Sequence, residues 1–255
     1  MVNNGIPLWF RCFKGKHNPH AYSIQLIKDG ISFCFNLFSN KNYSIIFLAD
    51  RWFPNIEILS HIQSLGCFYC FRSKSFFTFS YYDSNGFLVT SHLRDIKPFV
   101  QHSKVFKNVF YTRKLFKTNI VVSNSSTPEP WYLVTNYNTS LAIKNYSYRF
   151  SIECIFKSQK TNGFRLESTN TQKVEHFISL FTIMCIALVW LTIIGVDYVK
   201  NKHTYYLKIR DTKHYKNNST SRLFSFFNLG LTIFNRCYYN TVNYTLKFNF
   251  VLYDV

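Results

Sequence analysis

Tyr146, Arg149, Glu153 and Lys160 carry four side chains of complementary chemistry at helical spacing. At about 100° per residue, a helix through these positions would hold all four side chains within an arc of roughly 60°. A carboxylate can bind a metal ion, while a guanidinium, an ammonium and a phenol can bind phosphate oxygens. One helix face would therefore suit a metal ion together with a phosphate backbone. A solvated ion pair between Arg149 and Glu153 is the simpler structural alternative.

A second candidate carboxylate is Asp50. It follows the apolar run Ser44 to Ala49, which is typical of a buried strand, so Asp50 is expected at a strand's carboxyl end. Phosphoryl transfer on DNA uses divalent metals held by carboxylates. Asp50 and Glu153 are therefore the candidate metal ligands, and Arg149 and Lys160 are candidate phosphate ligands.

The charge balance points to a polyanionic partner. The 255 residues include 30 Lys and Arg against 12 Asp and Glu, a formal net charge of +18. Nucleic acid or an anionic membrane would match this charge. A lysine-rich solvated surface is the alternative that requires no ligand.

The cysteines indicate a reducing compartment. Seven is an odd number and their spacing is irregular, unlike a disulfide framework. Cys67 and Cys70 form a lone C-x-x-C without a second Cys or His pair at zinc spacing, and the aromatic residues between them favour a strand. Residues 1–10 show no signal-peptide pattern, so we expect a cytoplasmic protein.

Strand-like and helix-like runs alternate over residues 1–72. The expected elements are a strand at 6–13, a helix at 20–38, a strand at 44–49, a helix at 54–65 and a strand at 67–71. This β-α-β-α-β order predicts an α/β sheet.

Residues 73–130 predict a β-rich inserted subdomain. Its short β-prone runs are separated by polar turns and lie at 76–82, 87–89, 105–112 and 119–123. A strand at 131–135 and the helix at 140–160 would return to the core, which extends to residue 200. Residues 201–255 form a basic and aromatic tail without a recognisable fold.

Phe177 to Val196 is a run of 20 residues without a formal charge, long enough to span a bilayer as a helix. Ser, Thr and Gly residues dilute the run, which favours a core helix packed on the sheet. We therefore expect no membrane partner, with a single-span membrane protein as the alternative.

Several segments together resemble the DDE transposases of the insertion-sequence 4 type. The segment from Trp131 to Glu167 contains WYLVTN and NYSYRFSIECIFKSQKTNGFRLE, and it fills all four positions of the family's Tyr-Arg-Glu-Lys series. FLADRWF, at residues 47–53, resembles the surroundings of the family's second catalytic aspartate, which corresponds to Asp50. GIPLWFRCFKG near the start resembles the strand between the first and second aspartates.

The resemblance implies a ribonuclease H-like fold, in which a mixed sheet flanked by helices is interrupted by the β-rich insertion. It implies cut-and-paste transposition, in which water activated by two Mg²⁺ or Mn²⁺ ions cleaves DNA and the freed 3′-hydroxyl attacks target DNA. Asp50 and Glu153 would be the catalytic metal ligands. The residues implied to bind DNA phosphates are Tyr146, Arg149, Lys160 and Arg51. The implied partner is double-stranded DNA at element ends and target, with a homodimer as one assembly state.

The family's first aspartate has no counterpart in this chain. It would lie on a strand before Ile6, and Asp29, the one acid before Asp50, falls in a helix-like run. We therefore expect an N-terminally truncated transposase whose first strands are missing and whose activity is lost or weak. A non-catalytic, basic DNA-binding derivative is the alternative function.

Overall fold

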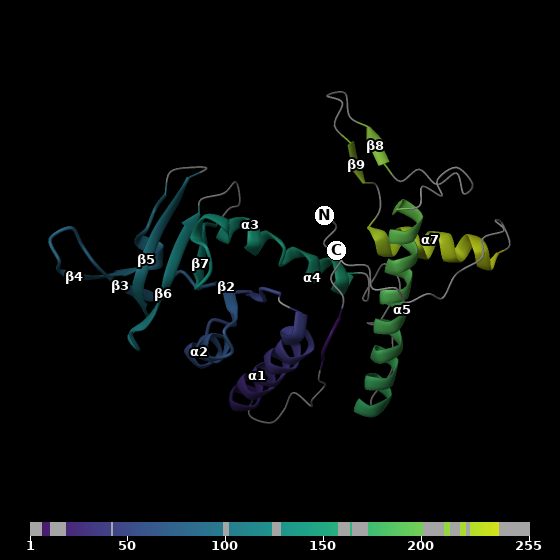
Figure 1. Ribbon diagram of the computed structural model, residues 1–255, viewed down its shortest axis with the longest axis horizontal. Coiled ribbons are helices and arrows are strands. Elements are labelled where there is room, and N and C mark those ends of the chain that lie inside the picture. Colours follow the sequence, from purple (N-terminus) through teal and green to yellow (C-terminus); the bar gives the residue numbers. More distant parts are fainter. Residues whose placement is uncertain are drawn as a thin grey trace. The chain divides into compact units, whose positions relative to one another are not determined.

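The chain divides into two compact units. A computed structural model describes residues 7–10, 19–41, 43–98, 102–123, 129–157, 164, 173–200, 212–214, 220–222 and 225–239. Gly15–Phe150 forms one unit, which we call the sheet unit, and Met1–Lys14 with Ser151–Val255 forms the other, the helical unit (Figure 1). The two units are separated after residues 14 and 150, whereas the predicted segments end at residues 72, 130 and 200. The predicted domain boundaries stay a prediction.

A seven-stranded mixed sheet is the centre of the sheet unit. Its strands are β1 (Ile46–Ala49), β2 (Phe68–Arg72), β3 (Thr78–Tyr82), β4 (Leu88–His92), β5 (Ser103–Tyr111), β6 (Phe116–Ser123) and β7 (Trp131–Thr135). Their order across the sheet is β1-β2-β7-β6-β5-β3-β4. β1 and β2 pair in parallel and every other neighbouring pair is antiparallel. The predicted α/β class is confirmed.

Helices cover the two faces of this sheet (Figure 1). One face packs against α1 (Pro19–Phe38) and α2 (Ile56–Ser64), and the other face packs against α3 (Ala142–Ser147). Alternation along β2 explains the arrangement, because Tyr69 and Phe71 point to α1 and α2 whereas Cys70 points to α3. The expected helices at 20–38 and 54–65 and the strands at 44–49 and 67–71 are confirmed within a few residues.

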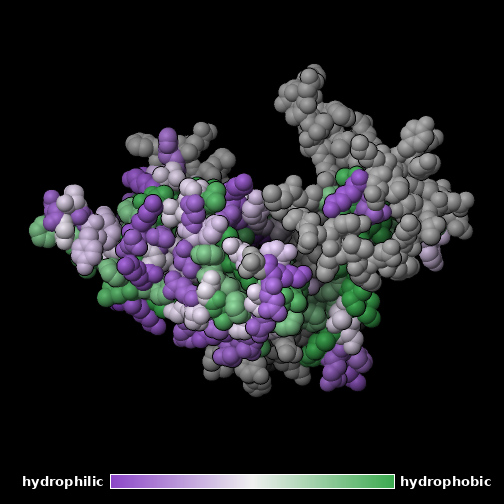
Figure 2. All heavy atoms as spheres, in the orientation of Figure 1, coloured by the Kyte–Doolittle hydropathy of each residue, from purple (hydrophilic) through white to green (hydrophobic). Residues whose placement is uncertain are grey.

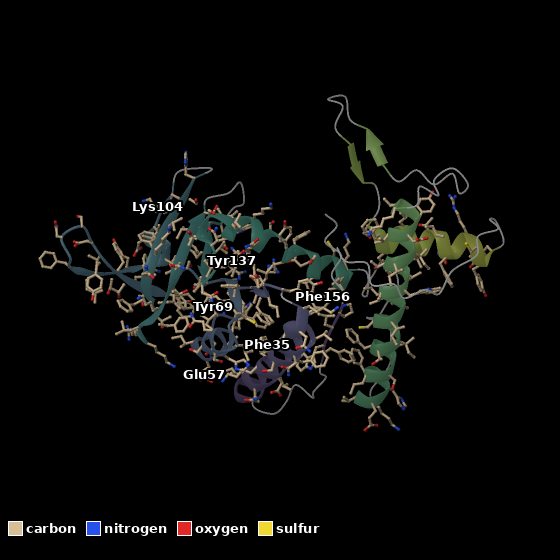
Figure 3. All side chains as sticks on the ribbon, viewed as in Figure 1. Phe35, Glu57, Tyr69, Lys104, Tyr137 and Phe156 are labelled. Atoms are coloured by element: carbon tan, nitrogen blue, oxygen red, sulfur yellow. The ribbon has the colours of Figure 1, made fainter. Side chains whose placement is uncertain are left out.

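A buried polar network joins three strands of the sheet. The Tyr69 hydroxyl lies 2.9 Å from Thr118 Oγ1, Thr118 Oγ1 donates to the Thr135 carbonyl, and Thr135 Oγ1 donates to the Tyr69 carbonyl at 2.7 Å. Tyr69 is labelled in Figure 3, and its side chain packs in the same buried hydrophobic cluster as the apolar residues of α2. Because Tyr69 is fully buried, desolvation raises its pKa to about 12, against smaller lowering effects of its hydrogen bonds to Thr118 and Gln63.

The β-prone segment at 73–130 forms strands as predicted, and those strands join the main sheet. β3, β4, β5 and β6 continue it without a break beyond β7. In β5 a bulge lies between Phe106 and Val109, where Asn108 has a positive φ of 53° and its N–H bonds the Asn119 side chain. The segment is therefore one half of a continuous sheet in this unit.

Close contact between α5 (Val174–Lys200) and α7 (Phe226–Tyr238) organises the helical unit. Gly195 of α5 touches the Phe226 carbonyl group, and Gly230 of α7 touches the Leu191 carbonyl group, at distances that leave no room for a Cβ atom at either glycine. The buried face of α5 lies against α7, and the expected packing of this helix on the sheet stays a prediction. The same unit contains α4 (Phe150–Lys157) except for its first residue, and it contains the hairpin of β8 (Thr212–His214) and β9 (Thr220–Arg222).

Among the described residues, α5 alone is long and apolar enough to cross a membrane, judged by length and composition. Exposed apolar residues lie on its surface, including Ile178, Ile183 and Ile186, and Figure 2 shows hydrophobic atoms along this helix. A core helix of a soluble protein passes the same test.

The expected strand at 6–13 differs from the structure. Its described part, residues 7–10, belongs to no strand, and residues 1–6 and 11–18 lie outside the described residues. Apolar composition alone favoured a strand there, but a strand also requires a hydrogen-bonding neighbour, and the structure shows none for residues 7–10.

Candidate nucleic-acid interface at the end of β1

Asp50 lies where the two parallel strands of the sheet end. Ala49 of β1 pairs with Phe71 of β2, so Asp50 and Arg72 are the next residues along neighbouring strands. A turn follows, in which the Phe53 N–H donates to the Asp50 carbonyl at 3.0 Å, and Asn55 caps α2 by accepting from the Glu57 N–H. Asp50 Oδ1 accepts the Arg51 backbone N–H at 2.8 Å. The predicted placement of Asp50 at a strand's carboxyl end is confirmed.

Tyr146 joins α3 to this strand end. Its hydroxyl donates to Asp50 Oδ1 at 3.4 Å, and its ring packs edge-on against Trp131 with centroids 5.1 Å apart. Only 2% of Tyr146 is exposed, and this burial is the main reason that its pKa rises to about 12. The Asp50 charge raises it further, while Arg149 and Arg72 lower it. Tyr146 is therefore a neutral hydrogen-bond donor to the carboxylate at physiological pH.

Arg149 lies beside the same tyrosine, in a turn that interrupts the predicted helix. Its guanidinium carbon is 5.5 Å from the centroid of the Tyr146 ring. The N–H groups of Tyr148 and Arg149 bond the carbonyls three residues earlier, which tightens the chain between α3 and α4. The helix predicted over 140–160 is confirmed at Ala142–Ser147 and Phe150–Lys157 and is interrupted by a turn at 148–149, and residues 158–160 lie outside the described residues. Tyr146 still reaches Asp50, and Arg149 lies beside the Tyr146 ring.

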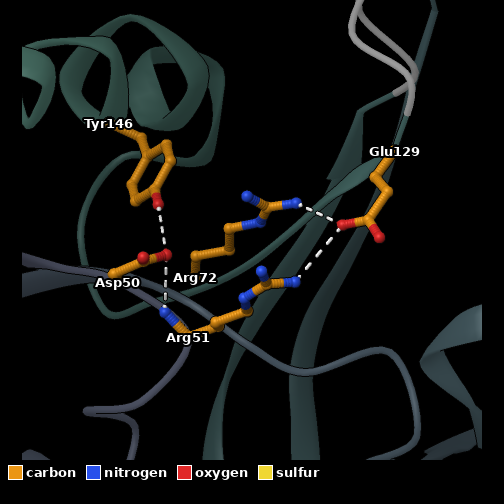
Figure 4. Close-up of polar contacts among 5 residues, drawn as sticks. All are labelled: Asp50, Arg51, Arg72, Glu129 and Tyr146. Atoms are coloured by element: carbon orange, nitrogen blue, oxygen red, sulfur yellow. Dashed lines mark hydrogen bonds and ion pairs between the residues drawn. The ribbon is translucent and has the colours of Figure 1, made fainter.

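Two arginines converge on one carboxylate next to Asp50 (Figure 4). Glu129 Oε2 accepts from Arg72 Nη2 at 3.0 Å and lies 3.5 Å from Arg51 Nη1. Arg72 is the better buried of the two, with 18% of its side chain exposed against 48% for Arg51. This end of the sheet unit thus combines two carboxylates, a buried phenol and three guanidinium groups.

Glu153 and Lys160 are the two remaining predicted site residues. Glu153 is an exposed residue of α4 and belongs to the helical unit, whereas Asp50, Arg51, Tyr146 and Arg149 belong to the sheet unit. Lys160 lies outside the described residues. The structure therefore brings four of the six predicted residues together.

Comparison with known families decides the lineage. The family model described as the transposase DDE domain matches residues 2–190, which include every site residue named above. The chain belongs to the transposase DDE domain family. A search of curated proteins found no match. Membership implies a role in DNA transposition and, with it, DNA binding.

DDE transposases typically use divalent metal ions, so the carboxylates of the sheet unit can be tested as ligands. Asp50 offers a carboxylate at a strand end, but one of its oxygens already accepts two hydrogen bonds. No three His, Cys, Asp or Glu side chains of the described residues cluster as a metal site. Asp50 and Glu153 belong to different units, and their joint binding of a metal ion is a proposal.

Sequence reasoning missed Arg72 and Glu129 as neighbours of the predicted site residues Asp50 and Arg51. Arg72 could have been found from the parallel pairing of the strands before and after α2, which places the residue after Phe71 beside Asp50. Glu129 has no comparable signal, since it lies 57 residues from Arg72 in the sequence and meets it through the folding of the sheet.

Proposed function

We propose that the chain acts on DNA as a DDE transposase of the insertion-sequence 4 type, with the end of β1 as its DNA-contacting site. The supporting observation is the group of Asp50, Tyr146 and Arg149 in the sheet unit, which are members of the type's signature positions. The ribonuclease H-like fold is part of this proposal, and it is supported by a mixed sheet with Asp50 at the end of a parallel strand.

The chain's own groups suit the binding of a phosphate backbone. Arg51, Arg72 and Arg149 provide guanidinium groups that can hydrogen-bond phosphate oxygens in pairs. Tyr146 is protonated and fixed against Trp131, so it can hold the Asp50 carboxylate in one orientation. Asp50 can accept a proton or a hydrogen bond at the strand end, at the point where the arginines would place a phosphodiester.

Catalysis is a further part of the proposal, with Asp50 and Glu153 as the carboxylates that would bind Mg²⁺ or Mn²⁺. Bound metal would supply the charge stabilisation and the activated water that DNA cleavage requires. The third carboxylate of the family stays a prediction, and the nucleotide sequence upstream of Met1 tests it. Double-stranded DNA is the proposed partner, and the cytoplasm is the proposed compartment.

The test combines DNA binding with nicking of supercoiled DNA in Mg²⁺ or Mn²⁺. We expect binding that weakens steeply with salt. If nicking is observed, Asp50→Asn and Glu153→Gln should each abolish it without abolishing binding. Nicking that survives both substitutions would contradict the assigned ligands, and absence of DNA binding at low salt would contradict the function.

A non-catalytic DNA-binding derivative is the second candidate. It is favoured by the arginines around Asp50, which do not depend on a complete set of carboxylates. Salt-sensitive DNA binding without nicking in either metal would support this candidate over the enzyme.

A further inference from the structure

The strand β4 forms one edge of the seven-stranded sheet (Figure 1). It pairs with β3 on one side, and no described strand pairs with its other side. Edge strands of soluble proteins usually carry lysine, proline, a bulge or a covering element, each of which prevents pairing with another chain. β4 has the sequence LVTSH, without lysine or proline, and its register with β3 is unbroken. It therefore keeps the regular backbone that a further strand requires.

The backbone groups of Leu88 and Thr90 face away from β3. The Asp83 N–H donates to the Phe87 carbonyl at 3.0 Å, which places the backbone groups of Phe87 on the side of β3. Successive residues of an antiparallel strand alternate between facing their partner strand and facing away from it. Val89 therefore bonds toward β3, whereas Leu88 and Thr90 each direct an N–H and a carbonyl to the open side.

Hydrogen bonds fix both ends of β4. In the turn before the strand, Asp83 Oδ1 accepts the N–H groups of Asn85 and Phe87 at 2.9 and 2.8 Å. At the other end, the His92 N–H donates to Asp95 Oδ2 at 3.3 Å. The open edge is therefore short, and it is ordered before any partner binds. Such order reduces the entropic cost of association.

The hairpin of β3 and β4 differs in charge from the rest of the chain. Its residues 78–92 contain one formally charged side chain, Asp83, whereas the whole chain carries +18. A polyanion would find no lysine or arginine there, and a second copy would meet no repulsion from basic side chains. Its exposed surface is largely apolar, since Tyr82 is 63%, Phe87 69% and Leu88 52% exposed. This edge thus fits another copy of itself better than nucleic acid.

We propose that two copies of the chain pair through β4, antiparallel to each other about a two-fold axis. Val89 then faces Val89 of the second copy, and Leu88 faces its Thr90, so every outward N–H of these residues meets a carbonyl of the other copy. Because both copies use the same surface, assembly closes at a dimer. β1 lies at the opposite edge of the sheet, so this contact leaves Asp50 of both copies uncovered. The contact is small, and the dimer therefore dissociates on dilution.

Cysteine cross-linking of the full chain tests the register. Val89→Cys places two thiols opposite each other in a non-hydrogen-bonded pair, with Cβ atoms about 4.5–5.5 Å apart, close to the separation that a disulfide needs. Ser91→Cys is the matched control on the same strand and face, but its two thiols would lie roughly 14 Å apart along the strands. After treatment with an added oxidant, Val89→Cys should give several times more cross-linked dimer than the unaltered chain, whose native cysteines set the background. Ser91→Cys should stay at that background.

Sedimentation velocity at rising protein concentration measures the dimer itself. Thr90→Pro removes an outward N–H and keeps the ladder with β3, because proline is tolerated on the open side of an edge strand. Thr90→Val is its control, since it keeps the N–H and loses only the 2.7 Å hydroxyl contact with Ser80. Leu88→Lys places a charge on the edge of each copy. Its control is Leu115→Lys, at a leucine that is 58% exposed between β5 and β6.

We expect a reversible equilibrium between monomer and dimer. Thr90→Pro and Leu88→Lys should each weaken it about tenfold or more, and both controls should leave it unchanged. A monomer at every concentration, or a dimer that neither variant weakens, would overturn the proposal. Assemblies larger than a dimer would show contact between unlike surfaces and would overturn the two-fold pairing. Equal cross-linking of Val89→Cys and Ser91→Cys would overturn the register. None of these measurements involves DNA, so the proposed function is tested separately.

Discussion

The Tyr146 hydroxyl donates to Asp50 Oδ1 at 3.4 Å and thereby links α3 to the carboxyl end of β1. The two residues are 96 positions apart in the sequence, and the fold brings them together from opposite ends of the sheet unit. Tyr146 is 2% exposed and Trp131 contacts its ring, so the tyrosine is a fixed support for the carboxylate.

Removing the Tyr146 hydroxyl should lower the free energy of unfolding only slightly. This loss should be smaller when Asp50 is also replaced, because the hydrogen bond is then already absent. Tyr146→Phe keeps the ring packing and loses one hydrogen bond, so the free energy of unfolding should fall by about 1 kcal/mol. Tyr148→Phe alters a neighbouring tyrosine that makes no bond to Asp50. It should change the free energy of unfolding by less than about 0.5 kcal/mol. Urea unfolding of Tyr146→Phe, Asp50→Ala and the double variant gives the coupling energy. Additive losses would show that the hydrogen bond contributes nothing to stability.

Alkaline pH should destabilise the sheet unit through its buried tyrosines. Burial raises the pKa of Tyr69 from 10 to about 12, so the folded state keeps a proton that the unfolded state loses. This stabilisation is fully present below pH 10 and is lost as the pH rises from 10 to 12, a loss on the order of 2 kcal/mol.

Comparison of unfolding free energies at pH 8 and pH 11.5 measures this loss. Tyr69→Phe should be less stable than the unaltered chain at pH 8, because the hydrogen bond to Thr118 is gone, yet it should lose less stability on going to high pH. Equal pH dependence in the two proteins would contradict the assignment of the titration to Tyr69.

The helical unit should depend on its two contact glycines. Gly230→Ala would drive a Cβ atom into the Leu191 carbonyl oxygen, and Gly195→Ala would do the same at Phe226. Each substitution should separate α5 from α7 at a cost of about 2 kcal/mol or more, although alanine favours an isolated helix.

Hydrogen exchange of the α7 amides would report this separation directly. Ser179→Ala is the matched control, since Ser179 is an exposed residue of α5 and alanine also raises helix propensity there. Faster exchange in both glycine variants and unchanged exchange in the control are expected. Unchanged protection of α7 in Gly230→Ala would show that the close approach is not required.

The sequence was most informative where one chemical pattern dominates a segment. Apolar runs with β-branched and aromatic residues located β1, β2 and β7 within two residues, because β2 and β7 are largely buried and β1 is partly buried along its whole length. The same reasoning found Asp50 at its strand end. It failed at the turn after α3, because the hydrogen bonds of Tyr148 and Arg149 depend on local geometry that side-chain periodicity does not encode.

Long-range partners were also beyond sequence reasoning. Arg72 and Glu129 carry no motif, and their meeting depends on the order of strands across the sheet. The same is true of Lys74 over Trp52, two residues that would each be interpreted separately as surface positions. Knowledge of the parallel β1 and β2 register would have found Arg72, but not Glu129 or Lys74.

If the arginines beside Asp50 contact DNA phosphates, the salt dependence of duplex binding reports those contacts. The slope of the logarithm of the binding constant against the logarithm of salt concentration counts phosphate contacts. Arg72→Gln should lower the magnitude of this slope by about 1, whereas Lys28→Gln, with the same change of charge at α1, should leave it unaltered. Equal slopes for the unaltered chain and Arg72→Gln would contradict the account.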